Sequence, residues 1–241
     1  APSKPDWPAD AASSHSGGVK GDKNRGVNAD SARQSLVTLD LEGVLVPEIW
    51  IAVAERTGIP ELQRTTRDGP GYDKLVRGRL GILDANGLTM PLIAEVIGAL
   101  EPLQGAREFL DTLRDRYQVV ILSDTFEQFG APLMRHLGMP TILCHRLVIA
   151  DDRIVDYRLR MSDQKRHAVE AFRALNYEVA SAGDSYNDSA MLGAANHGFW
   201  FHAPESIKAQ FPDFAATDDY DELLDLIAAA FNNGSDASAR I

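Results

Sequence analysis

Residues 36–46 read LVTLDLEGVLV, an apolar run that reaches two acidic residues followed by a glycine. An apolar run of this kind is typical of a strand buried on both faces of a parallel sheet. Open α/β sheets bind ligands at the carboxyl ends of such strands, where Asp40 and Glu42 would lie on the same side of the chain. Two neighbouring carboxylates repel each other unless they share a cation or a proton. The stretch therefore indicates a metal site or acid–base chemistry, with an acidic turn as the simpler alternative.

The composition of the 241 residues limits the class of protein. With 44% hydrophobic and 24% charged residues, the chain is long enough for one α/β core and a small inserted domain. Its net charge of −11 argues against nucleic-acid and membrane partners, because both favour a basic surface. The single cysteine, Cys144, excludes an internal disulfide and fits a reducing compartment. No apolar stretch approaches the ~20 residues that cross a bilayer, so we expect a cytoplasmic protein.

The order of patterns along the chain predicts its domain organisation. Residues 1–35 lack apolar periodicity and are predicted to be a disordered tail, and residues 232–241 a second tail. Residues 47–100 show helical patterns, over 48–57, 72–86 and 90–100, which predicts a small helical cap inserted after the first strand. The core is predicted to comprise residues 36–46 and 101–231.

Helical and strand patterns alternate throughout the second part of the predicted core, which indicates a doubly wound, Rossmann-like parallel sheet. The predicted strands cover residues 118–122, 141–144, 178–182 and 198–201, with a polar hairpin at 147–149 and 154–160. The predicted helices cover residues 105–117, 129–137, 164–175, 187–195, 205–211 and 220–231.

Polar residues follow two of these strands and begin one helix. They are Ser123, Asp124, Lys165, Asp184, Asn187 and Asp188. Parallel strands end on one edge of a sheet, so we expect these residues near Asp40 and Glu42. A hydroxyl beside free backbone N–H groups suits a phosphate oxygen, and carboxylates suit a hard cation. Each residue also has a simpler interpretation, as a turn residue for Ser123, a solvated charge for Lys165 and helix caps for the two aspartates.

Taken together and in order, these residues resemble the four motifs of the haloacid dehalogenase superfamily of phosphotransferases. The resemblance covers about residues 36–230. The segments DLEGVLVPEIW at 40–50, ILSDTF at 121–126 and AGDSYND at 182–188 resemble the phosphoserine phosphatase branch. Within that branch they are most similar to the bacterial phosphoserine phosphatase/homoserine phosphotransferase type. The chain departs from the common pattern at Glu42, where most members have a second aspartate.

The resemblance implies Mg²⁺-dependent phosphoryl transfer from L-phosphoserine through an aspartyl-phosphate. Asp40 is implied as the nucleophile and Glu42 as the acid and base. The implied phosphate-binding residues are Ser123, Asp124 and Lys165, and the substrate-binding residues are Glu48, Arg79 and Asn187. The implied metal residues are Asp40, Glu42, Asp184 and Asp188, with a backbone carbonyl near Glu42 as one ligand.

The head group of the substrate would require one cation and one anion beyond the phosphate site. The resemblance assigns Arg79 to the carboxylate and Glu48 to the ammonium group. Arg77 competes with Arg79, because two residues apart on a helix point about 200° apart and only one faces the pocket. Trp50 is interpreted as a border of the substrate pocket or, more simply, as apolar filling between cap and core.

Several alternatives remain open on the sequence alone. The acceptor is water, homoserine or both. A second hypothesis is the same chemistry on another small phosphomonoester. A third is a catalytically silent binding module, which would be expected to have lost at least one motif residue, and none is missing. The sequence does not determine the oligomeric state, and a homodimer is compatible with it.

Overall fold

The computed structural model describes residues 33–64 and 72–238. The predicted tail at 1–35 lies outside this part except for its last three residues, of which two begin the first strand. The sheet contains seven strands in the order β4-β3-β2-β1-β5-β6-β7. They are β1 (Gln34–Leu39), β2 (Gln118–Phe126), β3 (Thr141–Ala150), β4 (Arg153–Arg158), β5 (Tyr177–Gly183), β6 (His197–Phe201) and β7 (Ala215–Thr217).

Strand β1 occupies the middle of the sheet and pairs in parallel with β2 and β5. Leu39 lies opposite Ile121 of β2 and Ala182 of β5, so the residues after these three strands meet at one edge. All other pairs are parallel except the hairpin of β3 and β4. The predicted α/β class with a Rossmann-like parallel sheet is confirmed.

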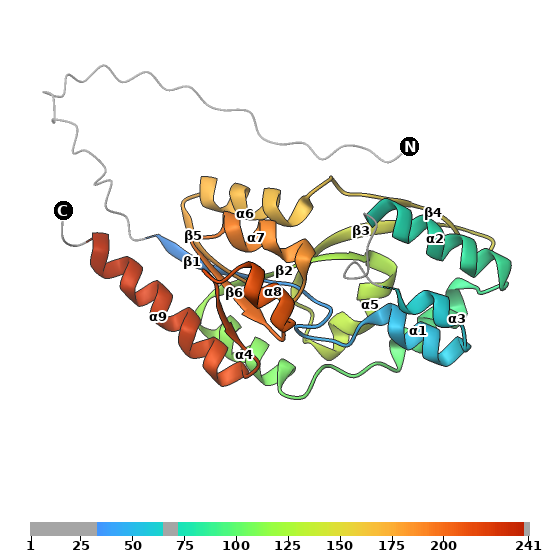
Figure 1. Cartoon of the computed structure of the whole chain (residues 1–241), viewed down its shortest axis with the longest axis horizontal. Helices are drawn as coiled ribbons and strands as arrows, with labels where there is room; N and C mark the ends of the chain where they lie inside the picture. The colour runs from blue at the N-terminus through green and yellow to red at the C-terminus, as the bar shows by residue number, and fades with distance from the viewer. Residues whose placement is uncertain (1–32, 65–71, 239–241) are drawn as a thin grey trace, which may run out of the picture. The chain divides into compact units, whose positions relative to one another are not determined.

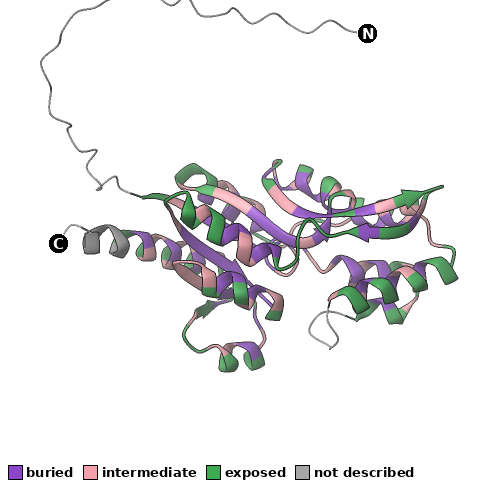
Figure 2. Ribbon diagram, turned by 90° about the horizontal axis from the view of Figure 1, so that it is seen from above, coloured by how far each residue is buried: buried purple, intermediate pink, exposed green. Residues whose placement is uncertain are grey.

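Helices cover both faces of the sheet (Figure 1). On one face lie α4 (Ala106–Arg116), α5 (Glu127–His136) and α9 (Tyr220–Ser238), and on the other lie α6 (Gln164–Ala174), α7 (Ser189–Ala194) and α8 (Glu205–Gln210). Alternate residues of β1 point to opposite layers, because Val37 packs in the first hydrophobic cluster and Leu36 in the second. Figure 2 shows the central strands buried along much of their length, whereas the helices bury one side.

A helical segment separates β1 from β2, as predicted. It contains α1 (Ile49–Thr57), η1 (Pro60–Gln63), α2 (Tyr72–Ala85) and α3 (Met90–Gly98), and its described residues between 47 and 100 form no strand. Helix α2 contacts β4, and Met90 at the start of α3 donates its backbone N–H to the carbonyl of Asp152 in the β3–β4 turn. The hairpin therefore supports this segment from the core.

Some boundaries differ from the predictions. Strand β3 is continuous through residues predicted to separate two strands, and β7, with the sequence Ala-Ala-Thr, is too short to give a pattern. Helix α9 runs to Ser238, beyond its predicted end at 231, although Asn, Gly and Ser are poor helix formers. Among the described residues, no single helix has both the length and the apolar composition to span a membrane. Of the described helices, only α2 and α3 taken together, with a bend of 111° between them, meet both criteria.

Candidate active site

A pocket lies at the carboxyl ends of β1, β2 and β5 and is bordered by α1 and α2. The predicted site residues that line it are Asp40, Glu42, Glu48, Arg79, Ser123, Asp124, Lys165, Asp184 and Asn187. Asp188 does not line the pocket, because it is fully buried behind Lys165. The structure thus brings together residues that are up to about 150 positions apart in the chain.

Lys165 joins two of the acidic residues. Its Nζ lies 2.8 Å from Oδ1 of Asp40 and 2.8 Å from Oδ1 of Asp188, and all three side chains are buried. Burial opposes the charge of Lys165, but Asp188 and Asp40 outweigh it and raise the pKa of the lysine well above its usual value. Burial and the nearby Asp188 raise the pKa of Asp40. Lys165 opposes this rise in the pKa of Asp40, because its positive charge favours the ionised carboxylate.

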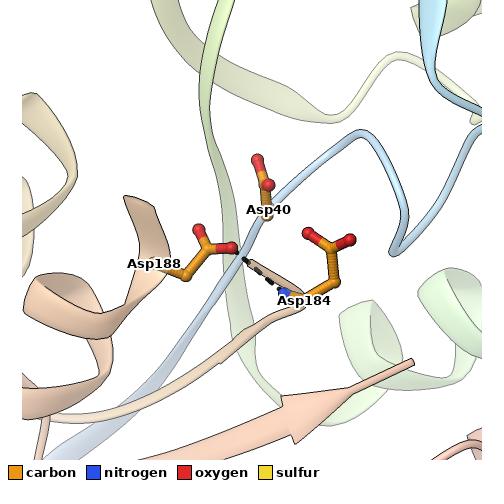
Figure 3. A group of neighbouring side chains, drawn as sticks. All are labelled: Asp40, Asp184 and Asp188. Carbon is orange, nitrogen blue, oxygen red and sulfur yellow. Dashed lines mark hydrogen bonds between the residues drawn. The ribbon is translucent and has the colours of Figure 1, made fainter. Parts of the chain in front are cut away.

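Asp40, Asp184 and Asp188 form a cluster of carboxylates in which one oxygen from each lies within 4.8 Å of the others (Figure 3). Oδ2 of Asp188 accepts the backbone N–H groups of Asp184 at 3.0 Å and Ser185 at 3.1 Å, which fixes the loop after β5. Three buried carboxylates beside one lysine leave an excess of negative charge. This set of oxygen donors fits a hard divalent cation.

Gly43 allows Asp184 to approach the loop after β1. Its φ of +77° lies in the left-handed region, and a Cβ added there would lie 2.3 Å from Oδ2 of Asp184. The glycine of the motif is thus required both by the backbone conformation and by the closeness of a cluster carboxylate.

Glu42 lies outside the carboxylate cluster. Its Oε2 accepts the backbone N–H of Ile49 at 2.9 Å, at the start of α1. Burial, followed by the charge of Glu48, raises the pKa of Glu42 to about 7, although the Ile49 N–H and Arg79 oppose the shift. The Glu42 side chain thus lies apart from the three clustered carboxylates, in a position that suits proton transfer near neutral pH. The metal ligand predicted near Glu42 is a backbone carbonyl, and this prediction does not require the side chain to face the cluster.

Ser123 and Asp124 extend from β2 into the pocket. The hydroxyl of Ser123 accepts the backbone N–H of Thr125 at 3.2 Å. The Asp124 carboxylate accepts hydrogen bonds from the amides of Asn187 and Gln164, each at 3.1 Å. Burial would raise the pKa of Asp124, but Lys165 and these donors lower it below its usual range. Asp124 is thus a fixed anion that orients Asn187.

The structure decides which of the two candidate arginines, Arg77 or Arg79, faces the pocket. Arg77 is exposed and pairs with Asp73, whereas Arg79 is buried and lines the pocket. Burial lowers the pKa of Arg79 to about 10, against the opposing effect of Glu42 and Glu48. Arg79 therefore stays a cation at neutral pH, beside two acidic residues of the same pocket.

Residues 35–196 match the family model of the haloacid dehalogenase-like hydrolases. The chain belongs to this family. It is 59% identical over 189 residues to phosphoserine phosphatase ThrH of Pseudomonas aeruginosa, covering 78% of this chain and 92% of that protein. It is also 58% identical over 189 residues to a phosphoserine phosphatase of Pseudomonas syringae pv. tomato, covering 78% of this chain and 80% of that protein.

Solved structures share the fold of this haloacid dehalogenase-like hydrolase. A phospho-aspartyl intermediate analogue of phosphoserine phosphatase superimposes with a TM-score of 0.68 at 20% identity, over 80% of this chain and 98% of that one. The phosphoserine phosphatase from T. onnurineus gives a TM-score of 0.65 at 24% identity, over 84% and 98% of the two chains. At these identities the likeness concerns the fold alone.

Two residues that hold β2 at the site of this haloacid dehalogenase-like hydrolase were not predicted. Tyr72 donates its hydroxyl to the backbone carbonyl of Asp124 at 2.6 Å, which connects α2 to the last part of β2. Gln164 donates to the backbone carbonyl of Ser123 at 2.6 Å from the position before Lys165. Neither residue stands in a motif, and a contact across 52 positions leaves no local pattern. Gln164 could have been considered through its neighbour Lys165.

Proposed function

We propose that the chain is a Mg²⁺-dependent phosphatase of L-phosphoserine that forms an aspartyl-phosphate on Asp40. The observation that carries this proposal is the presence, in one pocket, of the clustered carboxylates Asp40 and Asp184 together with the buried cation Arg79 and the carboxylate Glu48. A phosphate and an amino-acid head group present the complementary charges. The relatives named phosphoserine phosphatase, at 58–59% identity, support the same substrate.

The charges of the site explain why a cation is needed. Asp40 and a phosphate are both anions, and two unit charges ~4 Å apart at an effective dielectric of ~20 repel by about 4 kcal/mol. Lys165 supplies part of the compensation, since its Nζ contacts Asp40. Mg²⁺, held by Asp40, Asp184 and a backbone carbonyl near Glu42, with Asp188 as the outer carboxylate, would supply positive charge to the phosphate oxygens.

The proposed reaction has two steps. In the first, an Asp40 carboxylate oxygen forms a bond to phosphorus, the bond from phosphorus to the serine oxygen breaks, and Glu42 gives its proton to that oxygen. Oδ1 of Asp40 is held by Lys165 and by the backbone N–H of Leu41 at 2.8 Å, which fixes the rotamer of the nucleophile. In the second step, the acceptor hydroxyl gives a proton to Glu42 and attacks phosphorus, and the Asp40 carboxylate leaves.

We propose water as the acceptor and homoserine as a second acceptor. Homoserine carries the same ammonium and carboxylate as serine, so Glu48 and Arg79 suit both leaving group and acceptor. Ser123, Asp124 and Lys165 are proposed to bind the phosphate, and Asn187 to contact the substrate from the Asp124 side. We further propose that residues 47–100 act as the cap over a core of residues 36–46 and 101–231.

The test is incubation with Mg²⁺ and L-phosphoserine, with and without homoserine, while free phosphate and phosphohomoserine are both measured. We expect Mg²⁺-dependent phosphate release, and phosphohomoserine when homoserine is present. Phosphate release without phosphohomoserine would remove homoserine as an acceptor. Release from a sugar phosphate but not from L-phosphoserine would instead support the phosphatase of another phosphomonoester.

The raised pKa of Glu42 predicts a substrate-dependent pH profile. Glu42 must be protonated to assist the departure of serine, so kcat/KM for L-phosphoserine is expected to fall as pH rises through about 7. p-Nitrophenolate leaves without a proton, so the fall of kcat/KM with rising pH is expected to be weak or absent for p-nitrophenyl phosphate. Initial rates from pH 5.5 to 9 with saturating Mg²⁺ measure both profiles. The same fall for both substrates would contradict the role of Glu42 as acid.

Gly43→Ala is expected to weaken the binding of Mg²⁺, because the new Cβ would displace the Asp184 carboxylate. We expect the Mg²⁺ concentration for half-maximal activity to rise about tenfold or more, the usual range when a ligand's support is changed. Gly58→Ala is the matched control, because Gly58 has a φ of +70° but no atom within 4 Å of an added Cβ. An equal rise in both variants would attribute the effect to backbone strain alone.

Arg79→Ala is expected to raise KM for L-phosphoserine about 100-fold or more, because a buried, charged hydrogen-bonding partner of the substrate is lost. p-Nitrophenyl phosphate has no carboxylate, and its KM should change several-fold less. Steady-state kinetics with both substrates measure this difference, and Arg77→Ala serves as the control because Arg77 is exposed. Equal losses for the two substrates would remove Arg79 from substrate recognition.

A further inference from the structure

The indole of Trp50 lies against the guanidinium of Arg79. Trp50 is the second residue of α1, Arg79 belongs to α2, and Cζ of the arginine lies 4.6 Å from the centre of the indole ring. The two residues are only 6% and 8% exposed, and both line the pocket. A guanidinium over an indole face is attracted by the electrons of the ring, most strongly where water is excluded. This contact is thus more than apolar filling.

Among the described residues, one hydrogen bond holds the guanidinium of Arg79. Its Nη2 donates to the backbone carbonyl of Arg64 at 2.6 Å. Its Nε is buried and has no hydrogen-bond partner among the described residues. An unpaired buried donor disfavours the observed position, so a side chain held mainly by one hydrogen bond requires a second restraint. The indole provides that restraint by limiting the plane in which the guanidinium lies.

Trp50 is itself fixed by the core. The ring of Phe129 in α5 meets the indole edge-on at 5.5 Å, and Phe126 meets Phe129 at 5.7 Å. The residue before Trp50, Ile49, donates its backbone N–H to Glu42 at 2.9 Å. The first two residues of α1 therefore position both the acidic group and the buried cation of the pocket.

We infer that Trp50 is a positioning residue that orients the Arg79 guanidinium toward the carboxylate of the substrate, and so determines selectivity for phosphate esters that carry one. The inference rests on the proposed function, since it requires Arg79 to bind that carboxylate. It adds an uncharged specificity determinant that acts through Arg79.

The test compares O-phospho-L-serine with O-phosphoethanolamine, which lacks only the carboxylate. For Trp50→Leu, we expect kcat/KM to fall about tenfold with phosphoserine and less than about twofold with phosphoethanolamine, within the range of a desolvated cation–π contact. Trp50→Phe keeps an aromatic face and should lose about threefold with phosphoserine. In an Arg79→Ala background, Trp50→Leu should no longer change the ratio between the two substrates.

Val53→Ala is the control for a general loss of packing. Val53 is fully buried on the same helix, and its truncation should affect both substrates equally. Thermal unfolding of each variant shows whether the protein is folded at the assay temperature. A second measurement uses the Asp40→Asn background, where substrate is not turned over. Phosphoserine should change the tryptophan fluorescence more than phosphoethanolamine, and Trp50→Phe should remove the difference.

The outcomes separate the inference from the proposed function. If wild-type protein turns over phosphoserine but Trp50→Leu loses activity equally on both substrates, Trp50 is a structural residue and the inference is wrong. If wild-type protein turns over phosphoethanolamine as well as phosphoserine, Arg79 does not select for the carboxylate and the inference also fails. If wild-type protein does not act on phosphoserine at all, the proposed function itself is overturned.

Discussion

Asp40→Asn is expected to reduce turnover of L-phosphoserine by at least about 10⁴-fold, because the amide cannot serve as the nucleophile. The variant keeps the size of the side chain, and the Leu41 N–H can still donate to the remaining amide oxygen. The loss should therefore appear in the rate and not in the fold. Initial-rate measurements and thermal unfolding of the purified variant measure the two quantities separately.

Asp84→Asn is the matched control for this change. Asp84 is an exposed aspartate that pairs with Arg153 at 2.7 Å, so the same substitution should leave turnover within about twofold of wild type. If Asp40→Asn kept more than a few per cent of wild-type activity, transfer through an aspartyl-phosphate on this residue would be wrong. Direct attack of water on phosphorus would then be the better account.

Lys165→Met is expected to have the second largest effect, because it removes the cation between two buried carboxylates. Breaking a buried ion pair on one side costs about 3–5 kcal/mol, and Asp40 and Asp188 would both lose their contact with Nζ. Turnover should fall by at least about 100-fold, since positive charge near the transferring phosphate is lost. Chemical denaturation and initial rates measure these two effects.

Magnesium should affect the stability of this variant differently from that of the wild type. Asp40 and Asp188 repel each other once Lys165 is absent, and a divalent cation bound to the folded state compensates by mass action. The gain in stability on adding Mg²⁺ should thus be larger for Lys165→Met. Lys208→Met, which removes a surface lysine paired with Glu205, should change stability by less than about 1 kcal/mol. Similar small changes for both lysines would contradict the role of Lys165.

The sequence was sufficient for the parts of the site that follow from sheet geometry. Asp40 and Asp184 follow strands of a parallel sheet and Ser123 lies near the end of another, and a parallel sheet places such residues on one edge whatever the details of packing. The pattern of β1 and the alternation of helices and strands were enough to predict that geometry. The helical segment after β1 was equally visible, because its residues lack strand patterns.

The sequence was not sufficient for features of the site that depend on the direction of a side chain or on contacts between distant residues. Arg77 and Arg79 are alike in type and differ only in which side of α2 faces the pocket. Glu42 stands two residues from Asp40, yet its carboxylate turns to the start of α1 and not to the cluster. The contact of Trp50 with Arg79 joins two separate helices, so the periodicity of neither helix predicts it. Such features depend on packing between elements, which local pattern does not encode.

The most direct test of the account is the position of the phosphoryl group on the enzyme. Wild-type protein is mixed with Mg²⁺ and L-phosphoserine, quenched in acid during turnover, digested, and analysed by mass spectrometry. The account predicts one added phosphoryl group on the peptide that contains residues 36–46, located on Asp40. A phosphoryl group on another residue, such as Ser123, or turnover without any phosphorylated peptide under conditions that preserve acyl phosphates, would contradict it.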